Sequence, residues 1–190
     1  GVTTITRDSF GEILAVKDAG GAVMQFVLNA LGLPVTWLDW RGAQHAFEWD
    51  SHGNCTSHTF PNGAKIQFEY DWWGRRVREI DANGEAIQTT YDNSGRATSN
   101  INPLGHAVRF QYDAMGNVVV VTRPDGASFQ IDYAGLNWPY RIKHPDGSEL
   151  RAFYNREGWM MELHNERGEK YLFDHTLDGF VSWEKNFHGQ

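Results

Sequence analysis

The sequence predicts an all-β protein, built as an array of about nine antiparallel β-hairpin repeats that form a curved ribbon. Three observations predict this fold class. Glycine recurs every 21 residues in two interleaved series, apolar and polar residues alternate between the glycines, and residues typical of tight turns precede each glycine. The repeat runs through residues 1–190 without a linker, so we expect one array and no second domain.

The glycine series give the repeat its register. The first is Gly21, Gly42, Gly63, Gly84, Gly105, Gly126, Gly147, Gly168 and Gly189, and the second is Gly11, Gly32, Gly53, Gly74, Gly95, Gly116, Gly158 and Gly179. The second series is interrupted only by Asn137, and asparagine is the residue that best replaces glycine at a positive φ angle. The two series account for 17 of the 20 glycines, so function must be sought in an array.

Strands are expected on both sides of each turn, in chain order. The first repeat, from Thr3 to Val16, follows the pattern weakly, and the second alternates Met24, Phe26 and Leu28 with residues 23, 25 and 27. In the third repeat the return strand, residues 54–58, is almost entirely polar. We therefore expect that strand to pack least well.

The central and later repeats alternate most regularly. Their apolar positions are Ile66, Phe68 and Tyr70; Ile87, Thr89 and Tyr91; Val108, Phe110 and Tyr112; Phe129, Ile131 and Tyr133; Leu150, Ala152 and Tyr154; and Tyr171, Phe173 and His175. Alternation with period two predicts half-buried antiparallel strands with one apolar and one polar face. No segment has a helical period, so almost no helix is expected.

The turns explain why there are two glycine series. At one end of the hairpins Asp71, Asp92 and Asp113 occupy the first turn position, where a carboxylate accepts backbone N–H bonds. Gly74, Gly95 and Gly116 then take the left-handed position of a hairpin turn with a bulge. Gly84, Gly105 and Gly126 do the same at the other end. Four prolines, Pro61, Pro103, Pro124 and Pro145, fall at the second turn position, which favours their fixed φ angle.

Composition excludes several functional classes. The net charge is −7 with Lys and Arg scattered, whereas a nucleic-acid surface needs a basic stripe. Cys55 is the only cysteine, so neither a disulfide nor a thiolate metal site can form within the chain. We find no membrane span or signal peptide in the sequence. The chain starts without methionine and stops just after a turn glycine, so we expect a fragment of a longer protein.

No group of residues has the pattern of a catalytic, cofactor or metal site. The eight histidines are dispersed over different repeat positions, and the row of aspartates is explained by turn capping. We therefore predict no catalytic residue, no cofactor and no metal. The aromatic residues that recur at one repeat position favour packing, and the alternative is a carbohydrate-binding face. Ring exposure distinguishes the two, because ligand-binding rings are open to solvent.

The pairs Tyr70-Asp71, Tyr91-Asp92 and Tyr112-Asp113, each followed by Gly74, Gly95 or Gly116, resemble the tyrosine-aspartate (YD) repeats of the bacterial Rhs family, shared with toxin-complex shell proteins and teneurins. The resemblance covers essentially the whole chain and is most specific in these three repeats. It implies a segment of a hollow β-shell that encloses a C-terminal toxin domain. The partners it implies are the enclosed toxin and neighbouring repeats of the same chain.

The resemblance also implies a bacterial protein that is cytoplasmic before export and is then secreted or delivered by a secretion system. The first functional hypothesis is accordingly a structural, non-enzymatic shell segment. The alternatives are a carbohydrate- or cell-surface-binding hairpin module and, less favoured, a β-propeller fragment, because two hairpins make a blade of 42 residues. Open sheet edges further predict self-association.

Overall fold

The computed structural model describes residues 2–135 and 137–188, and these residues form β-strands and turns without a helix. Gly1, Gly189 and Gln190, which entered the sequence interpretation as chain ends or as part of a glycine series, lie outside the described residues. The described part of the chain also contains no helix with the length and apolar character of a membrane span.

The chain divides into two compact units, Gly1–Thr90 with Ile101–Gly105, and Tyr91–Asn100 with His106–Gln190. The strands of the first unit are β1 (Thr4–Arg7), β2 (Ile13–Lys17), β3 (Val23–Leu28), β4 (Pro34–Leu38), β5 (Gln44–Trp49), β6 (Cys55–Thr59), β7 (Lys65–Tyr70), β8 (Arg76–Ile80) and β9 (Ala86–Tyr91). Those of the second are β10 (Ala97–Ile101), β11 (Ala107–Tyr112), β12 (Val118–Thr122), β13 (Ser128–Ala134), β14 (Trp138–Lys143), β15 (Glu149–Tyr154), β16 (Met160–His164), β17 (Lys170–His175) and β18 (Val181–Lys185). One residue of β9 and one of β10 belong to the other unit.

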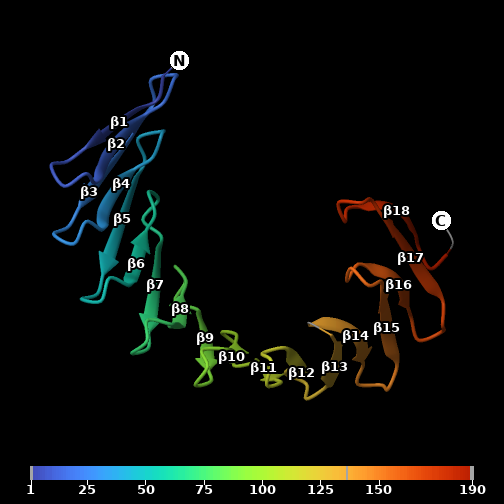
Figure 1. Cartoon of the computed structure of the whole chain (residues 1–190). Helices are drawn as coiled ribbons and strands as arrows, with labels where there is room; N and C mark the ends of the chain where they lie inside the picture. The colour runs from blue at the N-terminus through green and yellow to red at the C-terminus, as the bar shows by residue number, and fades with distance from the viewer. Residues whose placement is uncertain (1, 136, 189–190) are drawn as a thin grey trace. The chain divides into compact units, whose positions relative to one another are not determined.

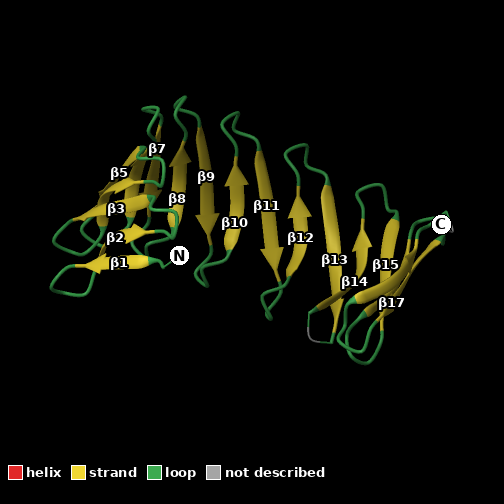
Figure 2. Ribbon diagram, turned by 90° about the horizontal axis from the view of Figure 1, so that it is seen from above, coloured by secondary structure: helices red, strands yellow, loops and turns green. Residues whose placement is uncertain are grey.

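Within each unit, strands that follow one another in sequence pair in antiparallel fashion. In the first unit β7 pairs with β6 and β8, and in the second β12 pairs with β11 and β13. Figure 1 shows the hairpins of each unit side by side in chain order, and Figure 2 shows them as single-layered sheets. The predicted fold class, an all-β array of antiparallel hairpins, is confirmed.

A bulge recurs just before the turns that follow β1, β3, β5, β7, β11, β13, β15 and β17. The register shifts between Glu69 and Tyr70 in the first unit and between Gln111 and Tyr112 in the second. An extra residue at this point increases the local twist of the strand pair. In both strands, β7 and β11, the bulge lies directly before the tyrosine that ends the strand.

A single layer leaves little of the chain fully buried. Among the described residues Ala107 is the one buried apolar residue, at 9 % exposure, and most apolar positions of the strands are half-buried. Half-burial of one face is what the period-two pattern predicts. Stability therefore comes from cross-strand contacts and from ties between neighbouring hairpins.

The prediction that the polar strand β6 packs least well is wrong. Ser57 is the most buried residue of the described chain, at 1 % exposure, because it lies between the longer cross-strand neighbours Glu48 and Gln67. On the other face His58 stacks on Phe47, with ring centroids 4.5 Å apart. A small serine and an aromatic imidazole thus fill positions that a hydropathy pattern classifies as unfavourable.

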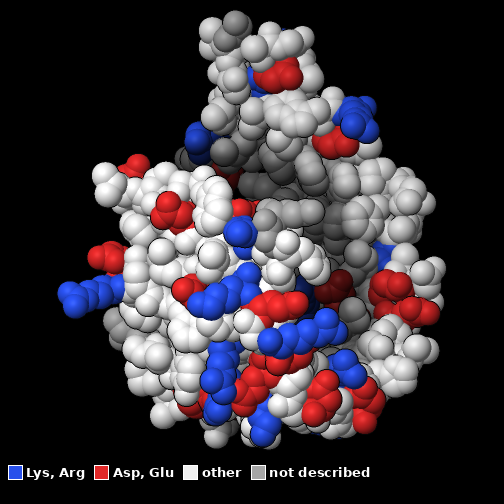
Figure 3. Space-filling view, turned by 90° about the vertical axis from the view of Figure 1, so that its right-hand side faces the viewer, with Lys and Arg blue, Asp and Glu red and all other residues white. Residues whose placement is uncertain are grey.

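Charged side chains of both signs are interspersed on the face drawn in Figure 3. In the second unit Arg141 pairs with Asp132 and Lys170 pairs with Glu162 on neighbouring strands, whereas Arg151 pairs with Glu149 within β15.

Candidate functional site

The repeated turn is the first element of the candidate site. At the turn of residues 113–116 the Gly116 N–H donates to the Asp113 carbonyl at 3.2 Å, and Gly116 has φ 92°. Asp113 Oδ1 accepts the N–H groups of Met115 and Asn117 at 2.9 and 2.8 Å. This is a three-residue hairpin turn with a left-handed glycine and a capping carboxylate.

The same arrangement recurs at Asp71 and Asp92, whose Oδ1 atoms each accept two backbone N–H groups. Hydrogen bonds to the ionised carboxylate lower the pKa of Asp92, chiefly through the Arg96 N–H, and that of Asp113, chiefly through the Asn117 side chain. The glycines at the opposite hairpin ends, Gly84, Gly105 and Gly126, also have positive φ angles. Asn137, the residue that interrupts the second series, has φ 70°.

Aromatic side chains at or near the ends of β5, β7, β11, β13 and β15 tie these hairpins to the previous one. The Tyr70 hydroxyl donates to the Cys55 carbonyl at 2.8 Å, and the Tyr112 hydroxyl donates to the Ala97 carbonyl at 2.7 Å. The equivalent bonds are Trp49 Nε1 to Pro34 at 2.8 Å, Tyr133 to Val118 at 3.0 Å and Tyr154 to Pro139 at 2.9 Å. In every case the acceptor lies 15 residues earlier, at the start of the previous return strand.

These hydrogen bonds, which we call the tyrosine ties, were not predicted from the sequence. The signal for them was present, because an aromatic residue with a polar tip recurs every 21 residues. The ring positions are half-buried from Trp49 to Tyr154, Tyr91 included. Burial raises the pKa of the Tyr70, Tyr133 and Tyr154 hydroxyls, which keeps them protonated as donors.

The arginine after the turn glycine links the same parts. Arg96 Nε donates to Asp92 Oδ2 at 2.7 Å, its Nη1 donates to the Asp113 carbonyl at 3.1 Å, and its Cζ lies 4.6 Å from the Tyr112 ring centroid. Arg75 repeats the bond to its own turn aspartate, Asp71, at 2.7 Å. Arg96 therefore joins one turn to the tyrosine and the turn of the next hairpin.

Two of the histidines, which sequence position alone predicts to be dispersed, lie together in the first unit. His45 Nδ1 and His58 Nε2 are 2.9 Å apart, with one imidazole donating its N–H to the other. The Trp37 ring stacks on the His45 ring with centroids 4.5 Å apart, and the Phe60 and His58 ring centroids are 4.1 Å apart. Aromatic rings therefore surround the histidine pair. The sequence signal for this contact was the separation of 13 residues, which places His45 and His58 on the two strands of one hairpin.

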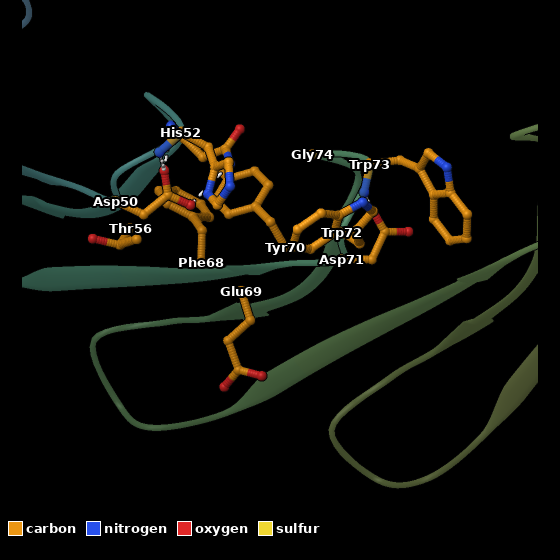
Figure 4. Close-up of a pocket in the computed structure, with 11 residues that line it drawn as sticks. Asp50, His52, Thr56, Phe68, Glu69, Tyr70, Asp71, Trp72, Trp73 and Gly74 are labelled. Atoms are coloured by element: carbon orange, nitrogen blue, oxygen red, sulfur yellow. Dashed lines mark hydrogen bonds between the residues drawn. The ribbon is translucent and has the colours of Figure 1, made fainter. Parts of the chain in front are cut away.

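A groove of about 670 Å³ lies between the turns of residues 50–53 and 71–74 in the first unit. Its lining includes Asp50, His52, Tyr70, Trp72 and Trp73. The two indoles are 84 % and 75 % exposed, unlike the half-buried rings of the tyrosine ties. In Figure 4, which shows this groove, the Trp73 indole projects away from the His52 turn.

The described residues do not contain three or more His, Cys, Asp or Glu side chains grouped as metal ligands. The described residues instead form a repeated set of ties and turns, with an exposed aromatic groove in the first unit.

Comparison with known proteins identifies relatives of the whole array. A family model described as the teneurin YD-shell matches residues 2–172. The crystal structure of TcdB2–TccC3 is similar with a TM-score of 0.73 and 14 % identity, over 97 % of this chain and 12 % of that chain. The Photorhabdus luminescens Tc holotoxin pore with a TccC3 mutation is similar with a TM-score of 0.70 and 13 % identity, over 98 % of this chain and 14 % of that chain. No match was found among curated proteins.

At these identities the solved structures show a shared fold. The chain spans only 12 % and 14 % of the lengths of these two relatives.

Proposed function

Because this chain belongs to the teneurin YD-shell family, we propose that it is a non-catalytic segment of a shell wall that encloses a C-terminal toxin domain of the same polypeptide. The family match and the similarity to Tc toxin shell proteins support a structural role. We propose both that the array encloses a toxin and that it is part of a longer polypeptide.

The tyrosine ties carry the proposal. A wall must resist separation of neighbouring elements, and a single-layered sheet has no second layer to hold it. Each tie adds a hydrogen bond from one hairpin to the previous one, beside the strand ladder, and the ties recur in both units. Repeated elements that contact only their neighbours can extend a wall without limit on its length.

The proposed partners follow from this role. They are the toxin domain on one side of the wall and neighbouring repeats along it. We further propose that the protein is bacterial, is held in the cytoplasm before export, and is then secreted or delivered by a secretion system. In that setting the wall keeps the toxin from the producing cell.

Binding of carbohydrate along the repeated aromatic positions has less support. The rings of the tyrosine ties are half-buried, and their hydroxyls donate to backbone carbonyls, so neither the ring faces nor the polar tips are free for a sugar. The indoles of Trp72 and Trp73, which do not belong to the tyrosine ties, are by contrast open to solvent.

Limited proteolysis of the full-length polypeptide that carries this array tests the proposal. We expect the toxin domain to resist cleavage, and paired Gly95→Val and Gly116→Val substitutions to expose it by opening the wall. The matched control is Asn137→Gly, which should leave protection intact. Equal cleavage of the toxin domain in all three proteins would disprove enclosure.

A further inference from the structure

The groove between the turns of residues 50–53 and 71–74 combines open aromatic rings with negative charge. Trp72 is 84 % exposed, and its indole meets the His52 ring edge to face, with centroids 5.9 Å apart. The rings of Tyr70 and Phe68 contribute to the same lining. Neither Lys nor Arg is among the described residues that line the groove.

Asp50 supplies a carboxylate that does not pair with a Lys or Arg side chain of the described residues. Its Oδ1 accepts the His52 and Asn54 N–H groups at 2.9 Å, and its Oδ2 accepts Asn54 Nδ2 at 2.9 Å. All three donors are neutral, and Asp50 makes no ion pair within the described residues. In the adjacent turn Asp71 differs, because Arg75 pairs with it at 2.7 Å. The Asn54 side chain also keeps the pKa of Asp50 below its ordinary value, so the charge persists at neutral pH.

Aromatic rings beside the groove already hold cations. The Arg75 guanidinium lies 4.9 Å from the Trp73 ring centroid, and the Arg76 guanidinium lies 5.2 Å from that of Phe68. Trp72 has no such partner among the described residues. The electron-rich face of an indole attracts a cation, and a carboxylate on the same side of the groove adds Coulomb attraction.

Figure 4 shows which side chains of the lining point away from Asp50 and His52. The Glu69 carboxylate points to the opposite side of its strand from Asp50 and His52, and Trp73 projects away from them. Among the groups that remain in the lining are the Trp72, His52, Tyr70 and Phe68 rings and the Asp50 carboxylate. A sugar would need several unused hydrogen-bonding groups, whereas the Asp50 oxygens are occupied and the Tyr70 hydroxyl donates to Cys55.

We propose that this groove binds an organic cation of the methylated ammonium class, with its methyl groups on the Trp72 indole and its charge facing Asp50. A methylated ammonium needs aromatic faces and a nearby negative charge, and it does not need hydrogen-bond donors or acceptors. The same headgroup occurs in free choline and in phosphatidylcholine, and both carry the recognised chemistry.

The test is titration of the whole chain with tetramethylammonium chloride at constant ionic strength, followed by NMR of the Trp72 indole N–H. We expect saturable shifts, and we expect binding of the neutral carbon analogue of choline, 3,3-dimethylbutanol, to be weaker. Each exposed cation–aromatic contact contributes about two- to fivefold in affinity. Trp72→Ala should therefore weaken binding by at least that factor, measured by calorimetry.

Asp50→Asn removes the charge while keeping the turn, because Asn29 caps the equivalent turn with the same two N–H bonds, at 2.9 and 3.0 Å. It should weaken tetramethylammonium and leave 3,3-dimethylbutanol unaffected. Trp40→Ala, which removes an exposed indole from a turn at the other hairpin end, is the matched control and should change nothing.

Phosphatidylcholine vesicles distinguish the two sources of the headgroup. Co-sedimentation with the vesicles that depends on Trp72 would identify the lipid headgroup as the ligand. Binding of free choline without binding of the vesicles would identify the soluble cation as the ligand. The proposal is overturned if neither binds, if the neutral analogue binds as tightly as the cation, if Asp50→Asn has no effect, or if an oligosaccharide binds through Trp72 in place of the cation.

Discussion

The hydroxyl of Tyr112 donates a 2.7 Å hydrogen bond to the carbonyl oxygen of Ala97, which begins the return strand of the previous hairpin. Strand pairing alone connects neighbouring hairpins through backbone groups, which any sequence can supply. This bond adds a side-chain contact that depends on one residue type at one repeat position. The tyrosine of the repeat therefore helps to fix the position of each hairpin against the previous one.

Replacing Tyr112 by phenylalanine tests this tie. The ring keeps its packing, but the Ala97 carbonyl loses a hydrogen bond in a half-buried site, so we expect a loss of about 1 kcal/mol in the free energy of unfolding. Urea denaturation measures it. Tyr140→Phe serves as the control and should leave stability unchanged, because the Tyr140 hydroxyl makes no hydrogen bond within the described residues. Equal stability of the Tyr112→Phe protein and the parent would show that the tie contributes nothing.

Replacing Gly116 by valine should destabilise the array through the backbone. Gly116 has φ 92°, and a Cβ placed there would meet no atom within 4 Å, so the cost is conformational strain and not a clash. Such strain costs about 1–3 kcal/mol. Chemical denaturation should show it, and a loss below about 0.5 kcal/mol would contradict the role of the left-handed turn.

Asn137→Gly is the converse change. Asn137 is the one non-glycine residue with a positive φ angle among the described residues, at 70°. Glycine adopts that conformation without the steric cost that a side chain brings. We expect a neutral or stabilising effect in the same denaturation assay, and clear destabilisation would indicate that the asparagine side chain makes a contact of its own.

Acid should destabilise the first unit through His58. Burial, followed by the proximity of His45, lowers the pKa of His58 below its ordinary value of 6.5. The unfolded chain then binds a proton near pH 6.5 that the folded chain accepts only at lower pH. Stability present above this range is therefore lost as the pH falls through it. Asp39 is the other charged group found to interact with His45.

His58→Phe keeps an aromatic ring against Phe47 and should flatten the dependence of the denaturation midpoint on pH between neutral and mildly acid conditions. His52→Gln, at an exposed turn, should leave the dependence as in the parent. A parallel fall of stability in the parent and His58→Phe proteins would exclude His58 as its source.

We predict that the chain has no intrinsic hydrolase or nuclease activity and holds no metal. The aspartates of the repeated turns use their oxygens to cap backbone N–H groups, which leaves them poorly placed as metal ligands. Elemental analysis after dialysis should find neither zinc nor calcium in stoichiometric amount. A full equivalent of either would overturn the prediction.

Self-association is expected for this segment in isolation. Every residue of β1 and every residue of β18 is exposed, and backbone groups at the edge of a sheet are templates for another strand. Light scattering at high micromolar concentration should detect oligomers, whereas an array extended by several repeats at each end should remain monomeric. A strictly monomeric short segment would show that these edge strands do not act as templates for another strand.

The sequence was sufficient to predict local geometry and insufficient for contacts between hairpins. Asp92 and Gly95 could be placed in a turn because their chemistry acts within four residues of the chain. The tie from Tyr112 to Ala97 and the pair of His45 with His58 depend on register and on which face each side chain takes, and neither follows from spacing alone. β6 was misjudged because hydropathy does not report that a small side chain such as Ser57 is covered by longer neighbours.

The direction of the tyrosine ties has a consequence for biosynthesis. Each donor bonds to a carbonyl 15 residues earlier in the chain, as Tyr133 does to Val118 and Tyr154 to Pro139. A chain that emerges from the ribosome amino terminus first therefore presents every anchor before the residue that needs it. Each new hairpin can dock as soon as it has been translated, without waiting for downstream sequence, so the array can assemble in step with its own synthesis.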